Sequence, residues 1–111
     1  MSRQKKISSL LKTEISLLLI KKINDDRIGF ISITDIKLSK DLAHAWVYYS
    51  QIGNDKEKER TKKGLASATK FIHAELSKLI RYMSIPKIHF RFDESLEKGV
   101  HLIKKIDEIN Q

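Results

Sequence analysis

The sequence of 111 residues predicts an α+β fold in which two amphipathic helices cover one face of a three-stranded sheet. Apolar residues recur at intervals of three and four in two long segments, which is the period of a helix. They alternate with polar residues in three shorter segments, which is the period of a strand. The segments follow the order helix, strand, strand, helix, strand, with a short helix at the end. A chain of this length supports one core, so we predict a single domain over residues 1–111.

The first helix is predicted from an apolar stripe that begins near residue 7, and Asn24 and Asp25 end it. A stripe at this spacing occupies one side of a helix and is typical of a helix that packs on a core. Basic residues gather at its start, outside the stripe. The stripe consists of Ile7, Leu10, Leu11, Ile15, Leu18, Leu19 and Ile23.

The next two segments predict a β-hairpin. Residues 30–38 alternate, but the phase changes near Thr34 and Asp35, which predicts a β-bulge there. A turn at 39–42 leads to the strand 43–51, where small residues alternate with aromatic ones. Small residues allow helices to approach closely, so we assign Ala43, Ala45, Val47 and Tyr49 to the helix side. The open face is then predicted to hold His44, Trp46, Tyr48, His89 and Arg91.

The second long helix has an apolar stripe from Leu65 to Met83, and Pro86 stops it because proline disfavours helix just before it. The polar segment 53–60 is predicted to be a loop within which this helix can already begin. The third strand follows, with Ile88, Phe90 and Phe92 on the helix side. A short terminal helix is predicted from the last apolar stripe, which consists of Leu96, Val100, Ile103, Ile106 and Ile109.

The net charge of +8 points to a polyanionic partner, and its distribution is uneven. Residues 1–24 carry six basic and one acidic side chain, a net of +5, and residues 62–91 carry seven and one, a net of +6. The remaining two segments are slightly acidic. A merely lysine-rich solvated surface does not explain why the excess is confined to two segments.

Signals for an enzyme are weak, so we expect a protein that is not a catalyst and needs no cofactor. The sequence has no phosphate-binding glycine loop and no Gly-x-Ser-x-Gly nucleophile motif. Its four histidines are scattered, which gives no metal site, and it has no cysteine, in agreement with a reducing compartment. The longest apolar run, residues 15–20, is too short to span a bilayer. We therefore expect a soluble, cytoplasmic protein that makes no membrane contact.

Binding of a phosphate chain is better supported. Lysines along the second helix neutralise phosphates, and the small residues in its segment 61–70 (TKKGLASATK) let a backbone approach closely. The alternative is an ordinary helix with a solvated basic face. The acidic residue Glu75 is the one side chain of the helix 65–83 that can form an intrahelical ion pair. The candidate RNA-binding residues are Lys5, Lys6, Lys12, Lys62, Lys63, Ser67, Ala68, Thr69, Lys70, His73, Lys78 and Arg81.

Three blocks of the chain resemble one family. Residues 32–50 (SITDIKLSKDLAHAWVYYS) resemble the hairpin signature of the bacterial ribosome-binding factor A family, and residues 85–99 (IPKIHFRFDESLEKG) are similar to its other characteristic block. Residues 25–29 (DDRIG) are similar to the family's Asp-Pro-Arg-hydrophobic-Gly, with Asp26 in place of the proline. The blocks follow in the family's order over nearly the whole chain.

The resemblance implies a type II KH-like domain, a monomer, that binds the free small (30S) ribosomal subunit and aids late maturation of its 16S rRNA, including the 5′ end. Where KH domains clamp nucleotide backbone with a Gly-x-x-Gly loop, the family has an Ala-x-Gly helix kink. This kink falls on Ala68, Thr69 and Lys70, and Lys70 stands where the family prefers glycine. In KH-like domains the nucleic acid lies beside the helices and an edge strand.

Two other functions stay open at this point. A general nucleic-acid-binding domain would bind DNA and rRNA with comparable affinity. A protein-interaction module would depend on the open face around Trp46 rather than on the lysines. Stacking of RNA bases on Trp46 and Tyr48 is a further alternative, worth roughly 1 to 3 kcal/mol per base.

Overall fold

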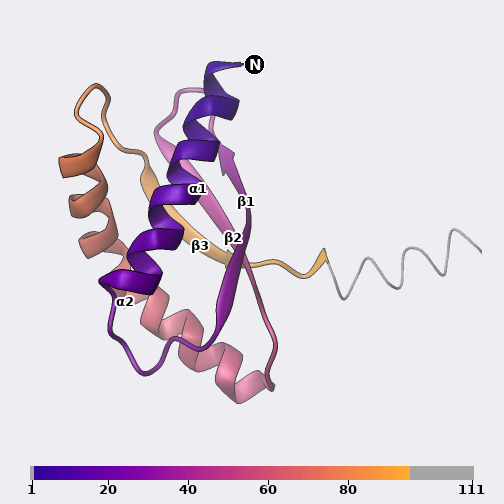
Figure 1. Cartoon of the computed structure of the whole chain (residues 1–111). Coiled ribbons are helices and arrows are strands. Elements are labelled where there is room, and N and C mark those ends of the chain that lie inside the picture. Colours follow the sequence, from indigo (N-terminus) through magenta and orange to yellow (C-terminus); the bar gives the residue numbers. More distant parts are fainter. Residues whose placement is uncertain (1, 96–111) are drawn as a thin grey trace, which may run out of the picture.

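In the computed structural model, residues 2–95 are described, and they form two helices and one three-stranded sheet (Figure 1). This confirms the predicted α+β class and the element order. The short terminal helix predicted between Leu96 and Ile109 lies outside the described residues. The elements are α1 (Arg3–Lys21), β1 (Ile31–Leu38), β2 (His44–Gln51), α2 (Asp55–Leu79) and β3 (Lys87–Phe92).

The sheet has the order β1-β2-β3, so β2 is central and β3 is an edge strand. β1 pairs with β2 antiparallel, as the predicted hairpin requires, whereas β3 runs parallel to β2. The register of β1 shifts between Ile33 and Asp35, which leaves Thr34 as the extra residue of a bulge. Because of this residue, Ile33 and Ile36 are both buried although they lie three positions apart.

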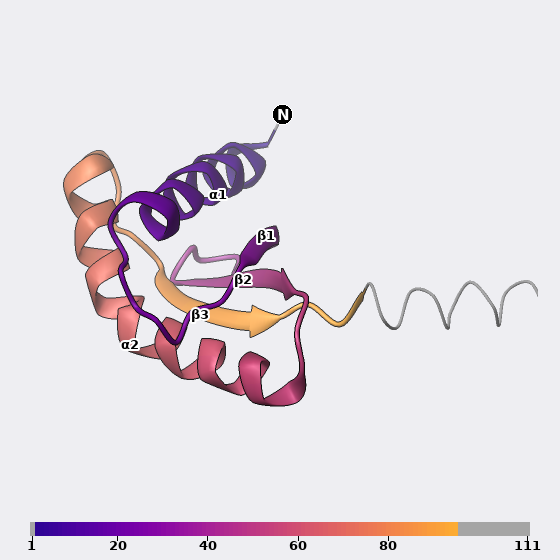
Figure 2. The same ribbon diagram turned by 60° about the horizontal axis from the view of Figure 1, so that its bottom comes forward.

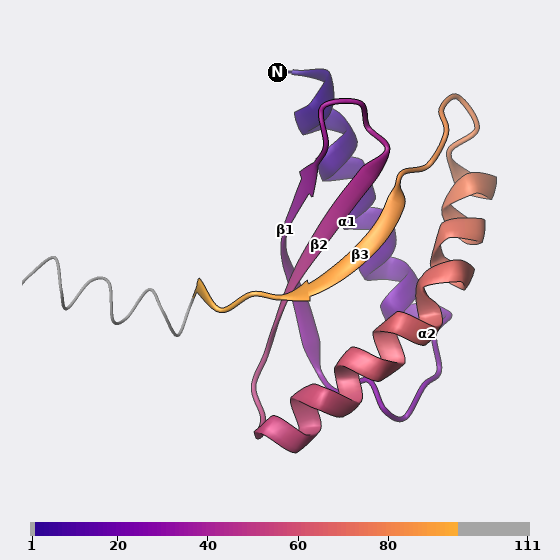
Figure 3. The ribbon, with the colours of Figure 1, turned by 180° about the vertical axis from the view of Figure 1, so that it is seen from behind.

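Both helices lie on one face of the sheet. Seen from behind, the strands lie in front of α1, and α2 lies beside β3 (Figure 3). The predicted helix side of β2 is confirmed for Ala45, Val47 and Tyr49, which are buried, whereas Ala43 is exposed at the end of the sheet. The core cluster consists of Ile7, Leu11, Ile15, Leu18, Ile33, Ile36, Ala45, Val47, Ile72, Leu76, Ile80 and Ile88.

α2 differs from the prediction at its C-terminal end. It begins at Asp55, within the polar segment 53–60 that was predicted to allow a start there, because Asn54 and Glu57 form a capping box. It ends at Leu79, so the prediction that it continues to Met83 was wrong. Ile80 leaves the helix in an extended conformation and is buried in the core. Burial of this side chain, rather than Pro86, ends the helix.

α2 changes direction near its middle (Figure 2), which confirms the predicted kink. The Thr69 hydroxyl donates to the carbonyl oxygens of Ala66, at 2.6 Å, and Leu65, at 3.2 Å. Such side-chain bonds compete for the carbonyls of the preceding turn and bend helices. The kink therefore forms with Lys70 in the position of the family's glycine.

Candidate nucleic-acid interface

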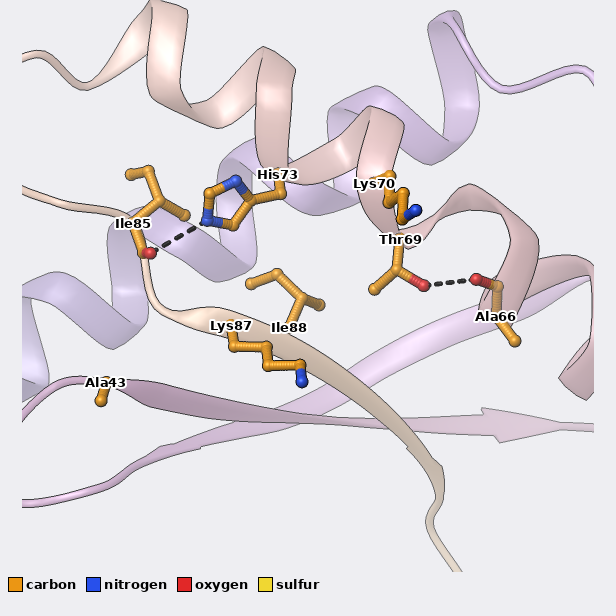
Figure 4. A pocket seen from close by; sticks show the side chains of 8 residues that line it. All are labelled: Ala43, Ala66, Thr69, Lys70, His73, Ile85, Lys87 and Ile88. Carbon is orange, nitrogen blue, oxygen red and sulfur yellow. Dashed lines mark hydrogen bonds between the residues drawn. The ribbon is translucent and has the colours of Figure 1, made fainter.

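A groove of about 600 Å³ lies between the bent part of α2 and the start of β3 (Figure 4). A second hollow of about 340 Å³ continues it along β3 and shares Ala66, Thr69 and Ile88 with it. We call the two together the α2–β3 groove. Its lining consists of Ala43, Tyr49, Lys62, Ala66, Thr69, Lys70, His73, Ile85, Lys87, Ile88, His89, Phe90 and Arg91.

Two contacts hold the walls of the groove together. The imidazole Nε2 of His73 lies 3.0 Å from the carbonyl oxygen of Ile85, which ties the segment before β3 to α2 (Figure 4). The amide of Lys87 donates to the carbonyl oxygen of Ala43 at 2.8 Å, which fixes the start of β3 against β2. One wall is thus a helix with a small side chain, Ala66, at the rim, and the other is an edge strand.

The groove is cationic. Four positively charged side chains line it: Lys62 and Lys70 on α2, and Lys87 and Arg91 on β3. No carboxylate of residues 2–95 is part of this lining. A strip of cations beside a small residue and a hydroxyl suits the phosphates of a nucleic-acid backbone.

The structure brings together four of the twelve predicted residues, namely Lys62, Thr69, Lys70 and His73. Lys63 and Ser67 are exposed on α2 outside the lining, and Ala68 packs against the core.

The other five predicted residues lie elsewhere. The Lys78 ammonium lies 3.9 Å from the Glu75 carboxylate, and Arg81 follows the end of α2. Lys5 lines a separate hollow between α1 and β1. Lys6 and Lys12 are exposed on α1.

Sequence reasoning missed Lys87, Arg91 and Ala66 as members of this groove. Arg91 is predicted on the open face only, but it also lines the groove, because β3 is an edge strand and a long side chain there reaches around the edge of the sheet. The signal was present in the charge excess of residues 62–91, which includes both β3 cations. What the sequence lacked was the parallel register that places β3 beside α2.

The open face of the sheet carries a second feature, an aromatic platform formed by His44, Trp46 and His89. The three rings lie 5.1 to 5.8 Å apart between centroids, with planes inclined by 20 to 27°. Nδ1 of His44 lies 2.9 Å from Nε2 of His89, so one nitrogen donates a hydrogen bond to the other. The two histidines thus meet across β2 and β3, and the predicted open face is confirmed for these three side chains.

The His44–His89 hydrogen bond requires that one of the two facing nitrogens has no proton. Burial, His44 and the cations Lys87 and Arg91 hold the pKa of His89 below its ordinary value. The unfolded chain therefore takes up more protons than the folded one as the pH falls below about 6.5, and acid favours unfolding. We expect the free energy of unfolding to decrease between about pH 7 and pH 5, as measured by urea denaturation followed by circular dichroism.

His89→Gln is expected to flatten this pH dependence. The carboxylates with lowered pKa, Asp25, Asp41 and Asp93, lose their stabilising contribution only below about pH 4, so they do not interfere in this window. An unchanged slope in the variant would show that His89 is not the group responsible.

The described part of the chain offers neither a metal site nor a membrane-spanning helix. No group of three or more His, Asp or Glu side chains among residues 2–95 is arranged to hold a metal ion. Neither α1 nor α2 combines the length and apolar character that crossing a membrane requires.

Comparison with known proteins adds to this geometry. The family model "Ribosome-binding factor A" matches residues 3–106. A ribosome-binding factor A from Dictyoglomus thermophilum is 44% identical over 108 residues, which cover 96% of this chain and 90% of that protein. One from Halothermothrix orenii is 41% identical over 109 residues, with 96% and 89% covered.

Solved structures have the same fold. The crystal structure of ribosome-binding factor A from Thermus thermophilus superimposes with a TM-score of 0.69 at 21% identity, covering 81% of this chain and 96% of that chain. A homology model of the Thermus thermophilus protein, fitted into the cryo-EM map of a 30S complex, gives a TM-score of 0.60 at 22% identity, covering 83% and 92%. At these identities the likeness concerns the fold.

Proposed function

This chain belongs to the ribosome-binding factor A family, and from that premise we propose that it binds the free small ribosomal subunit and assists late maturation of 16S rRNA, including its 5′ end. The observation that carries the proposal is the α2–β3 groove with its four cations. The Thermus thermophilus relative, which shares the fold, has been fitted into a map of a 30S complex. A basic groove on this fold supports contact with the RNA of that particle.

In this proposal the protein acts by binding, as a cytoplasmic monomer without a cofactor. Lys62, Lys70, Lys87 and Arg91 neutralise consecutive phosphates and release their counterions, which favours association at low salt. Ala66 lets the sugar–phosphate backbone approach α2. A factor that occupies an RNA strand in this way assists maturation by holding the strand in one arrangement.

Cosedimentation of the purified protein with free small subunits, large subunits and joined ribosomes at several salt concentrations tests the proposal. We expect selective binding to the free small subunit. If each of the four groove cations neutralises one phosphate, the logarithm of the affinity should fall with the logarithm of salt concentration at a slope of about −3 to −4. Equal binding to all three particles would leave a general nucleic-acid-binding domain, and a slope near zero would contradict the electrostatic mechanism.

A further inference from the structure

The aromatic platform of His44, Trp46 and His89 is preorganised. The hydrogen bond between the two imidazoles fixes both rings, and Trp46 and His89 are direct partners in the register of β2 and β3. All three side chains are half-buried, so their inner parts are held while part of each ring stays accessible. A planar ligand that stacks there would not have to order these side chains first, which lowers the entropic cost of binding.

The platform is continuous with the α2–β3 groove through the edge strand. His89 and Arg91 line the hollow that also contains Lys62 and Thr69, and the same two residues face Trp46. The Arg91 guanidinium carbon lies 5.9 Å from the centre of the Trp46 ring. A chain molecule bound in the groove therefore needs to cross only β3 to reach the platform.

The charges around the platform favour a polyanion that arrives from the β3 side. Lys87 and Arg91 stand on that edge, whereas the Lys37 ammonium lies over the Tyr48 ring, 5.5 Å from its centre, away from the platform. The carboxylates gather at the other end of the open face, where Asp35 and Asp93 line a hollow with Tyr48.

Near His44, the remaining acidic group is Asp41 in the β1–β2 turn. Its carboxylate accepts hydrogen bonds from the Ser39 hydroxyl and the Ala43 amide. These bonds hold the Asp41 carboxylate within the turn. A polyanion that approaches the platform therefore meets chiefly the cations on the β3 edge.

We propose that the platform of His44, Trp46 and His89 stacks an unpaired base of the RNA strand whose phosphates lie in the α2–β3 groove. This inference rests on the proposed function, because it takes the groove ligand to be RNA. Stacking on an aromatic side chain tolerates any base, since every base has a π-face. The platform therefore selects unpaired over paired nucleotides, a preference that the phosphate contacts of the groove do not provide.

Trp46 is the only tryptophan of the chain, so its fluorescence reports on the platform directly. The full chain is titrated with a hexameric oligoadenylate and with an abasic ribose-phosphate hexamer of the same charge. We expect the oligoadenylate to quench Trp46 emission and to bind more tightly than the abasic hexamer. Equal affinity for both hexamers without quenching would overturn the proposal.

A set of variants, measured with a dye-labelled oligoadenylate by fluorescence anisotropy, tests the same point independently. Trp46→Ala is expected to weaken binding by about five- to 150-fold, the equivalent of one stacked base, whereas Trp46→Phe keeps an aromatic ring and most of the affinity. Phe30→Ala, at an aromatic residue that is 94% exposed before β1, is the matched control and should bind like the native chain. Circular dichroism checks that each variant is folded.

Two results would overturn the proposal while leaving the function intact. In the first result, Trp46→Ala binds both oligoadenylate and the small subunit as tightly as the native chain does. In the second result, Trp46→Ala binds oligoadenylate normally but binds the small subunit more weakly, which would assign the platform to a ribosomal protein. Failure of the proposed function is separate. It would be seen as equal cosedimentation with free small subunits, large subunits and joined ribosomes, regardless of the effect of Trp46→Ala on oligoadenylate binding.

Discussion

Replacing Lys62 and Lys70 together by glutamate is expected to weaken binding to free small ribosomal subunits by about 100-fold or more. Each lysine lines the groove from α2, and a hydrogen bond to a charged group contributes roughly 1.5–3 kcal/mol. The slope of log affinity against log salt should become shallower by about 1 for each lysine that contacts a phosphate. Cosedimentation across a salt series measures both quantities.

Lys40→Glu with Lys56→Glu is the matched control, because it changes the net charge equally at two exposed positions outside the groove lining. It should lower the affinity only slightly. If both double variants weaken binding to the same extent, net charge rather than the groove governs association. A third pair, Lys5→Glu with Lys6→Glu, tests the α1 lysines that the sequence pointed to.

Thr61→Val is expected to destabilise the fold by about 1–3 kcal/mol, although valine has nearly the same shape. Thr61 is fully buried, and its hydroxyl oxygen accepts hydrogen bonds from the Gly29 amide at 3.0 Å and from the Gln51 side-chain amide at 2.8 Å. The Gln51 side-chain amide is buried and would be left without an acceptor, at a cost of about 1–3 kcal/mol, whereas Gly29 is exposed and its amide can bond to water instead. Urea denaturation of the variant measures the change in the free energy of unfolding.

Thr61→Ser is the control, because it keeps the hydroxyl and removes one methyl group, at a cost of about 1 kcal/mol. A serine variant less stable than the valine variant would show that packing, not hydrogen bonding, matters at this position. The position bears on the groove as well. Thr61 ties the first half of α2, which carries Lys62, to the segment before β1 and to the end of β2.

Much of the fold could be predicted because local patterns report on local structure. The alternation in residues 43–51 separated the buried Ala45, Val47 and Tyr49 from the aromatic side, and the phase change in residues 30–38 located the bulge at Thr34. Helix ends were predicted less well. The first turns of α2 are polar, so an apolar stripe does not reveal where the helix begins, and the capping box lies outside the stripe. The C-terminal end of α2 depends on where Ile80 is buried.

The candidate site could be predicted only in part. A basic segment can be read from the sequence, because charge is a property of composition, and the twelve candidate residues include the two α2 lysines of the groove. The sequence period tells on which side of an element a residue lies, but not which element faces that side. The sequence therefore does not distinguish Lys63 and Lys78, which lie outside the groove, from Lys62 and Lys70, which line it.

The sequence by itself determined the element order, the two faces of the sheet and the membership in a family. Only the tertiary structure decided which cations share a surface. β3 lies parallel to β2 and beside the bend of α2, so Lys87 and Arg91 meet Lys62 and Lys70 across a groove. That meeting depends on long-range register and on the hydroxyl of Thr69 bending the helix, and neither is encoded in the spacing of residues along one element.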